Sequence, residues 1–316
     1  MHETYVSIKG KWVKVPAFDI NGKTVVVKGG WLKTASVHDE EWSDEEIGDP
    51  GIYIKALKEN LEHGVRADIF TFTQKPPTTL PRYDYPTERE SVAVLCFNSF
   101  KDWWEGLPQE TRKNVRRAQK RGVSVRINKF DDEMVKGIVE LNNESPVRQG
   151  RAFSHYGKSF DQVKKDYSSF LDRSDLVCAY LGDELIGLSK VVYRGEIASV
   201  LQLLAKSSHY DKRPSNAILA KVVELCEAKN IHCLTYGLFS YGNKRNSPMQ
   251  EFKSRNGFAE MLIPRYTIPL TGRGALCLKL KLHRGLFGLL PERVVQAGLQ
   301  ARSKWYRFRQ AVDKPV

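Results

Sequence analysis

Residues 145–158 (SPVRQGRAFSHYGK) gather side chains that can bind anions or move protons within one short segment. The segment contains arginine, lysine, histidine, tyrosine and glutamine, and it has no acidic residue. Arginine binds carboxylate or phosphate through paired hydrogen bonds, and histidine can accept a proton near neutral pH. These residues therefore predict a loop that binds an anionic or carbonyl-rich group. The alternative is a basic surface loop that is merely solvated.

The candidate residues of this loop fall into two roles. His155 is the candidate base, because its imidazole titrates close to neutral pH. Glu140 and Glu144 lie one helical turn apart ahead of the loop, and we expect one of them to pair with Arg148 or Arg151. The predicted substrate-binding residues are Glu144, Arg148, Gln149, Arg151, Tyr156 and Lys158.

The net charge of +13 is concentrated in two other segments. Residues 111–130 contain eight Lys or Arg and no acid, and most of them fall on a helix predicted over residues 108–122. A helix with such a cationic surface favours phosphate or nucleic-acid binding. The residues predicted for this role are Arg112, Arg116, Arg117 and Lys120.

The second basic segment is the C-terminal tail, residues 273–316, which contains ten Lys or Arg and two acidic residues. Its pattern predicts two amphipathic helices broken at Pro291, although residues 276–282 also alternate as a strand does. Such a tail can lie on an anionic membrane surface, hold phosphates, or pack on the core with its charges in water. All three alternatives stay open.

The elements that must position these residues form three regions. Residues 1–90 alternate apolar and polar positions and predict a small β-rich domain, which ends in a proline-rich connection at residues 74–90. Residues 91–270 form the main domain, and residues 271–316 the basic helical tail.

Within the main domain, helices are predicted after Asn98 and over residues 108–122, 131–144, 159 onward, 216–229 and 248 onward. The predicted strands are residues 91–97, 123–129, 175–181, 184–193, 196–205, 231–236 and 258–269. Three of these strands are joined by short turns and should form an antiparallel meander, and later alternation implies at least one parallel crossover. The predicted fold class is α+β, with a mixed, mainly antiparallel sheet flanked by helices.

Composition limits the class of protein further. With 41% hydrophobic residues the chain can bury a core, and no apolar run approaches the roughly 18 residues of a membrane span. The five cysteines are odd in number and never spaced as C-x-x-C, so neither a disulfide framework nor a zinc site is predicted. We expect a cytoplasmic protein without a metal, with peripheral contact to the inner membrane face as an option through residues 275–312.

Three motifs carry a family resemblance: RKNVRRAQKRG at residues 112–122, RPSN at 213–216 and FKSRNGF at 252–258. Together with the order of elements over residues 98–269, they resemble the GNAT acyltransferase fold and, within it, the Fem-type branch that uses aminoacyl-tRNA. The resemblance implies transfer of an acyl or aminoacyl group from a thioester or an aminoacyl-tRNA to an amine or hydroxyl. It also makes residues 1–90 a candidate partial GNAT unit.

The same resemblance assigns roles to single residues. Lys253 is expected near the transferred acyl group, and Tyr236 and Tyr241 near the position where proton handling occurs. The donor's phosphates are expected near the start of the helix that follows the fourth strand, at Lys212, Arg213, Ser215 and Asn216. Residues 207–216 contain no glycine, unlike the phosphate loop of ordinary GNAT proteins, so acyl-CoA and aminoacyl-tRNA both stay open as donors.

The expected acceptor is a small molecule, peptide or saccharide with polar and anionic character, and tRNA is a further expected partner. A different class of function also fits the charge: a non-catalytic nucleic-acid-binding protein on a GNAT-like scaffold. That alternative predicts binding that weakens with salt and does not depend on Lys253 or His155.

Overall fold

The computed structural model describes residues 2–8, 11–43, 45–61, 66–148, 151–240, 247–284 and 297–298. The described residues divide into two compact units. Among the described residues, the first comprises those within 2–91 and 261–284, and the second those within 92–240, 247–260 and 297–298. The first unit therefore contains residues 261–284 in addition to the predicted N-terminal region.

The first unit is built on strands in the order β1-β2-β3-β4-β5-β14. Neighbouring strands are antiparallel except for β4 and β5, which are parallel. Its elements are β1 (His2–Ile8), β2 (Lys11–Ile20), β3 (Lys23–Lys28), β4 (Thr34–Val37), η1 (Glu40–Trp42), α1 (Pro50–Leu61), β5 (Ile69–Thr73), β14 (Ala259–Pro269), α8 (Gly272–Lys279) and η4 (Leu282–Arg284). Residues 276–282, for which helix and strand were both open, are thus largely helical.

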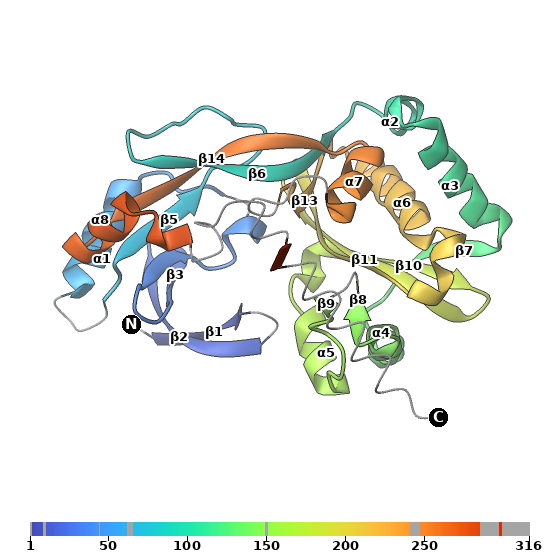
Figure 1. The fold of residues 1–316 in the computed structure, drawn as a ribbon, viewed down its shortest axis with the longest axis horizontal. Coiled ribbons are helices and arrows are strands. Elements are labelled where there is room, and N and C mark those ends of the chain that lie inside the picture. The colour runs from blue at the N-terminus through green and yellow to red at the C-terminus, as the bar shows by residue number, and fades with distance from the viewer. Residues whose placement is uncertain are drawn as a thin grey trace. The chain divides into compact units, whose positions relative to one another are not determined.

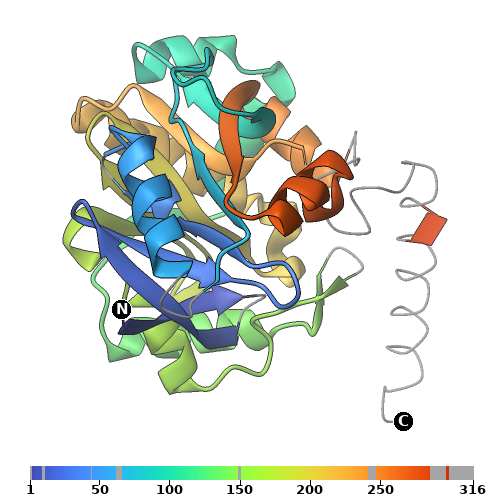
Figure 2. The same ribbon diagram turned by 90° about the vertical axis from the view of Figure 1, so that its left-hand side faces the viewer.

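Helix α1 covers one face of these strands, as Figure 2 shows. Its side chains Tyr53 and Leu57 are buried against Phe70 and Phe72 of β5 and Tyr266 of β14. The aromatic rings among them stack in two pairs. The ring centroids of Tyr53 and Phe70 are 5.9 Å apart, and those of Phe72 and Tyr266 are 4.6 Å apart. The first unit therefore has an aromatic core of its own.

The second unit has strands in the order β6-β13-β12-β11-β10-β7. The predicted meander of β10, β11 and β12 is antiparallel, and β12 pairs in parallel with β13 across helix α6. Its strands are β6 (Thr87–Cys96), β7 (Val123–Asn128), β10 (Ser174–Leu181), β11 (Glu184–Arg194), β12 (Ile197–Ala205) and β13 (Cys233–Leu238), and a separate small hairpin is formed by β8 (Val147–Arg148) and β9 (Arg151–Ala152). The first residues of β6 belong to the first unit.

Helices cover both faces of this sheet (Figure 1). They are α2 (Phe100–Gly106), α3 (Gln109–Lys120), α4 (Asp132–Asn143), α5 (Phe160–Tyr167), α6 (Pro214–Ala228) and α7 (Pro248–Arg255), with 3₁₀ turns η2 (Leu171–Arg173) and η3 (Ser207–Lys212). Side chains alternate along a strand, so β10 sends Val177 and Ala179 to the core under α6, and Cys178 and Tyr180 to the core under α4 and α5. The α+β class and the mixed sheet predicted from the sequence are confirmed.

One expectation from the cysteines is wrong. Cys96 at the end of β6 and Cys233 at the start of β13 form a disulfide across paired positions of neighbouring strands. The two residues are 137 positions apart in sequence, so only the strand register brings them together. Neither an odd count nor local spacing can reveal such a pair. Cys178, Cys226 and Cys277 are free and buried.

Candidate active site

Strands β12 and β13 of the second unit pair over only three residues and then separate. The last pair is Ser199 with Thr235, whose hydroxyls are 2.6 Å apart. Beyond it both strands are irregular: the register of β12 against β11 shifts after Val200, and β13 shifts against β6 between Thr235 and Leu238. Gly237 adopts a φ of +53° within this β13 irregularity. Bulges of this kind end regular pairing and redirect side chains, and they are frequent beside active sites.

A cavity of about 550 Å³ lies in the second unit where these strands separate. It is lined by the end of β12, the start of α6, Tyr236 of β13, the first turns of α7, and the β8–β9 hairpin with the residue after it. The lining residues are Arg148, Phe153, Leu203, Leu204, Ala205, Tyr210, Arg213, Pro214, Ser215, Asn216, Tyr236, Pro248, Met249 and Phe252.

Helix α6 presents its N-terminus to this cavity. Pro214 occupies the first helical position, and Arg213 before it has the left-handed φ of +59°, with no side chain capping the helix. The N–H groups of Asn216 and Ala217 donate to the Arg213 carbonyl over 3.2 and 3.3 Å, and the helix dipole makes such an end favourable for negative charge. Gly187 allows α6 to lie close to β11, because a Cβ at this position would lie 3.1 Å from both Ile218 Cδ1 of α6 and the Leu204 carbonyl oxygen.

A hydrogen bond joins two of the sequence motifs at this place. Asn216 of the RPSN motif donates from Nδ2 to Oδ1 of Asn256, in the FKSRNGF motif, over 3.0 Å. Asn256 is buried, donates to the Phe252 carbonyl over 2.7 Å, and its own carbonyl accepts from Trp103 Nε1 over 3.1 Å. The start of α6 and the end of α7 are thus fixed to each other, which sets one wall of the cavity.

Arg148 of β8 also lines the cavity and is held by several contacts. Its Nη1 donates to the Ala205 carbonyl over 3.2 Å, and its Nη2 to the Leu141 carbonyl over 2.6 Å. The guanidinium lies 4.2 Å from the Phe153 ring centroid, and only 10% of the side chain is exposed. The structure also contains the expected ion pair with Glu144, at 3.7 Å.

The carboxylate of Glu144 also binds the start of η3. It accepts hydrogen bonds of 2.7–3.0 Å from the backbone N–H and hydroxyl groups of both Ser207 and Ser208. Burial opposes ionisation of Glu144, but the bonds from Ser208 and Ser207 outweigh it, so its pKa is lowered. An ionised Glu144 fixes the connection between β12 and α6.

Lys253 of α7 is completely buried and points toward β13. Its ammonium donates to the carbonyls of Tyr236 and Leu238, over 2.6 and 2.7 Å, and lies 4.4 Å from the Tyr236 ring centroid. Lys253 does not line the cavity, whereas Tyr236 does. The geometry therefore supports a positioning role for Lys253, acting through the irregular part of β13.

His155 and Lys158 share a carboxylate on α5. Lys158 Nζ lies 2.5 Å from Asp166 Oδ2, and His155 Nδ1 lies 3.9 Å from the same oxygen. Burial lowers the pKa of His155, the charges of Lys158 and Arg148 lower it further, and Asp166 opposes them. Neither residue lines the cavity, and Tyr156 is exposed. Of the described loop residues predicted to bind substrate, only Arg148 reaches the lining.

The remaining predicted residues divide in the same way. Arg213, Ser215 and Asn216 line the cavity, while Lys212 does not and pairs with Asp211 at 3.3 Å. On α3, the guanidinium of Arg116 lies 5.6 Å from the Trp104 ring centroid, and Arg117 lies 3.8 Å from Glu110. No α3 residue lines the cavity, so the predicted phosphate role of Arg112, Arg116, Arg117 and Lys120 concerns a separate surface. Gln149, Tyr241 and the side chain of Arg151 lie outside the described residues.

Several lining residues were missed by the sequence analysis. Phe153 lies within residues 145–158, and Phe252 lies within the FKSRNGF motif. Both are apolar, and only their polar neighbours were predicted to be site residues. Tyr210 lies in the connection that lacks glycine. No sequence signal marked Leu203, Leu204 or Met249, because an apolar strand end looks the same whether it faces a core or a cavity.

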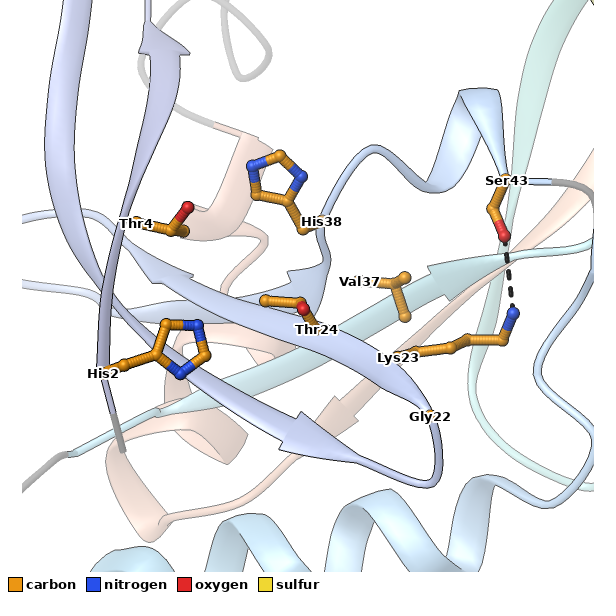
Figure 3. A pocket seen from close by; sticks show the side chains of 8 residues that line it. All are labelled: His2, Thr4, Gly22, Lys23, Thr24, Val37, His38 and Ser43. Atoms are coloured by element: carbon orange, nitrogen blue, oxygen red, sulfur yellow. Dashed lines mark hydrogen bonds between the residues drawn. The ribbon is translucent and has the colours of Figure 1, made fainter. Parts of the chain in front are cut away.

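The first unit has a smaller cavity of about 300 Å³, shown in Figure 3, lined by His2, Thr4, Gly22, Lys23, Thr24, Val37, His38 and Ser43. Each basic side chain in it already faces a carboxylate: His2 lies 3.5 Å from Asp19, His38 lies 3.1 Å from Asp39, and Lys23 lies 3.7 Å from Glu45. Each basic side chain of this cavity therefore has a carboxylate within 3.7 Å.

Across the part of the chain that the structure describes, no three His, Cys, Asp or Glu side chains are grouped as metal ligands are. No helix in that same part is long and apolar enough to cross a membrane.

Comparison with solved structures places the fold. The chain is similar to the structure of L-PGS from Bacillus licheniformis, with a TM-score of 0.57 and 13% identity, covering 87% of this chain and 90% of that one. It is also similar to the C-terminal DUF2156 domain of a candidate lysylphosphatidylglycerol synthetase from Agrobacterium fabrum, with a TM-score of 0.53 and 12% identity over 85% and 88% of the two chains. FemX aligns with a TM-score of 0.49 and 12% identity, over 89% and 90%.

No family model matches the sequence, and no curated protein is similar to it at the sequence level. At these identities the structural likeness concerns the fold alone. The predicted resemblance is confirmed for the fold, by two structures with TM-scores above 0.5.

Proposed function

We propose that the chain is an acyltransferase that moves an aminoacyl group from aminoacyl-tRNA to an amine or hydroxyl of a polar, anionic acceptor. The observation that carries this proposal is the cavity at the point where β12 and β13 separate, with the uncapped start of α6 in its wall. An activated acyl carbonyl placed there lies near the positive end of a helix dipole, which favours the negative charge that develops on the carbonyl oxygen during acyl transfer.

The preference for tRNA over acyl-CoA rests on the connection between β12 and α6. A glycine loop that wraps a pyrophosphate is absent, and the 3₁₀ turn η3 occupies this place, held by Glu144 through Ser207 and Ser208. Pro214 at the first helical position contributes no N–H. The eight basic residues between positions 111 and 130 offer a surface for the phosphates of an RNA.

The reaction needs a tetrahedral intermediate and one net proton movement. The acceptor nitrogen or oxygen attacks the ester carbonyl, a new C–N or C–O bond forms, the bond to the ribose oxygen breaks, and the acceptor's proton ends on that oxygen. The hydroxyl and the backbone N–H of Ser215 are the proposed donors to the developing oxyanion, because the N–H groups of Asn216 and Ala217 already donate to the Arg213 carbonyl. Tyr236, which also lines the cavity, is the proposed group for proton movement, and Lys253 and Asn256 position it and α6.

The proposed acceptor class includes anionic lipids with a free hydroxyl. One similar structure carries lysylphosphatidylglycerol synthetase in its name, and this supports testing phosphatidylglycerol first. The predicted contact of residues 275–312 with an anionic membrane would bring the protein to such an acceptor, and that contact stays a prediction.

The test is protein-dependent transfer of a labelled amino acid. Total tRNA charged with a mixture of labelled amino acids is incubated with the protein and phosphatidylglycerol vesicles, and label is followed from acid-precipitable RNA into the organic phase. Ser215→Phe, which fills part of the cavity at the start of α6, should reduce transfer at least tenfold. Lys221→Phe, on the same helix but outside the cavity lining, should leave it near wild type.

Two outcomes would contradict the proposal. The first is equal activity in the Ser215→Phe and Lys221→Phe proteins, because the cavity would then not hold the reacting group. The second is an absence of tRNA-dependent transfer combined with stabilisation by acyl-CoA in a thermal shift, which would assign the donor to the thioester class.

A further inference from the structure

The cavity of the second unit has a lining that lacks negative charge. Most of its lining side chains are apolar or aromatic, its uncharged polar groups are Ser215, Asn216 and the hydroxyls of Tyr210 and Tyr236, and its charged groups are Arg148 and Arg213. No Asp or Glu occurs among the described lining residues. The segments 149–150 and 241–246, which lie outside the described residues, contain no acidic residue in their sequence either.

The carboxylate beside Arg148 does not reverse this balance. Glu144 is not a lining residue, and its two oxygens accept four hydrogen bonds from Ser207 and Ser208 while lying 3.7 Å from the guanidinium. A ligand cation would have to compete with those donors and with Arg148 for the same oxygens. Glu144 is therefore not available as a partner for a positively charged ligand.

Arg148 is a fixed arginine in the lining, and its charge is shared with Glu144 at 3.7 Å, outside the lining. Its two Nη atoms donate to the carbonyls of Ala205 and Leu141, and its face stacks on Phe153, so it cannot move aside without losing these contacts. Among the described residues Arg213 makes no ion pair. A cation entering the cavity loses hydration and meets two like charges, and both effects are unfavourable.

An aminoacyl ester with an uncharged side chain avoids this cost. Its α-amine has a pKa of about 7.7–8 and can lose its proton near neutral pH, whereas a lysyl ε-amine with a pKa of about 10.4 stays charged. The apolar strand end Leu203–Leu204 and the ring of Phe252 instead offer favourable contact to an apolar side chain.

We infer that the acyl group held in this cavity has an uncharged, mainly apolar side chain, and that Arg148 is the residue that excludes lysyl and arginyl groups. The inference rests on the proposed function and adds the substrate class to it. The inferred substrate differs from the lysyl group that appears in the name of one similar structure, a lysylphosphatidylglycerol synthetase domain.

The first test is a donor panel in the transfer assay. tRNA species charged separately with alanine, leucine, lysine and arginine are compared at equal concentration with the wild-type protein. The better of the alanyl and leucyl donors should be used at least about tenfold faster than the lysyl or arginyl donor, the discrimination expected when a charge is buried beside like charge. Lysyl or arginyl transfer at an equal or higher rate overturns the inference and leaves the proposed function standing.

A binding measurement makes the inference independent of catalysis. Leucyl and lysyl groups are linked to 3′-amino-3′-deoxyadenosine through an amide, which cannot be transferred, and the thermal shift of the wild-type protein is measured with each compound. The leucyl compound should stabilise the protein more. If it does so while no donor is transferred, the proposed function fails and the inference holds. Equal or greater stabilisation by the lysyl compound, or no stabilisation by either, overturns the inference.

A charge placed in the cavity provides a gain-of-function arm. Ser215→Glu adds a carboxylate at the start of α6, where the helix dipole tolerates it, and Ser215→Gln is the matched control of the same size. The Glu variant should shift the ratio of lysyl to leucyl stabilisation toward lysyl by at least about fivefold in affinity relative to the Gln variant. An identical ratio in the two variants overturns the electrostatic argument.

Discussion

Replacing Lys253 by methionine separates a positioning role for this lysine from a direct role in the reaction. The side chain is fully buried and donates to two carbonyls of β13, at Tyr236 and Leu238. Methionine has a similar length and can fill the same space without a charge or a donor. The substitution therefore removes the hydrogen bonds with little change of packing volume.

The expected loss of stability follows from these contacts. Each hydrogen bond from a charged donor contributes about 1.5–3 kcal/mol, and the cation above the Tyr236 ring adds roughly 0.5–2 kcal/mol. Removing the buried ammonium also removes its desolvation cost, which offsets part of this sum. We expect the free energy of unfolding to fall by about 2–4 kcal/mol.

Urea unfolding of the full chain, followed by tryptophan fluorescence, measures this change. Arg255→Met is the matched control, since Arg255 lies on the same helix but is 62% exposed and forms only a surface ion pair with Glu251. That control should change stability by about 0–1 kcal/mol. A Lys253→Met protein that is as stable as the control and yet inactive would refute the positioning role and would indicate direct action on the substrate.

Three further outcomes are expected. Gly257 has a φ of +91°, and a Cβ there would lie 3.1 Å from Trp103 Nε1. Gly257→Ala should therefore lower the free energy of unfolding, measured in urea, by about 1–3 kcal/mol. An unchanged urea midpoint would contradict this prediction. Burial raises the pKa of Glu40 to about 7, so the contribution of this one group to stability is greatest below its ordinary pKa of 4.5 and is lost as pH rises toward 7. Glu40→Gln should remove this loss and be more stable than wild type at pH 8 by roughly 1–3 kcal/mol, and parallel pH profiles of the two proteins in urea unfolding would disprove the argument. The double variant Cys96→Ala, Cys233→Ala should have a free energy of unfolding about 2–4 kcal/mol lower than the oxidised wild type, measured in urea without reductant. Equal stability of the two proteins would show that the disulfide does not constrain the unfolded chain.

Much of the fold could be predicted because local patterns and tertiary structure agree. The capping box of Ser159 and Gln162 starts α5 where the sequence indicates, and the apolar strands joined by Gly182-Asp183 and Arg194-Gly195 form the antiparallel meander. The parallel crossover through α6 also follows from the order of elements. These features depend on residues that are close together in sequence.

Features that depend on distant residues could not be predicted. The Cys96–Cys233 disulfide and the Asn216–Asn256 hydrogen bond each need the sheet register before their partners are known. The polar loop was identified as a site by its composition, but Lys158 is paired with Asp166, and only Arg148 reaches the cavity lining among the described residues predicted there to bind substrate. Charge density in sequence does not tell which charges are already neutralised by a partner.

The most direct measurement of the central claim is the alkylation rate of a cysteine placed in the cavity. Ser215→Cys places a thiol in the cavity lining, and Lys221→Cys places one on the same helix outside the lining. Burial raises the pKa of the native thiols of Cys178 and Cys226 to about 12, so these two thiols react slowly. Charged tRNA should slow iodoacetamide labelling of Ser215→Cys at least fivefold and leave labelling of Lys221→Cys unchanged. Equal labelling of Ser215→Cys with and without charged tRNA would contradict it.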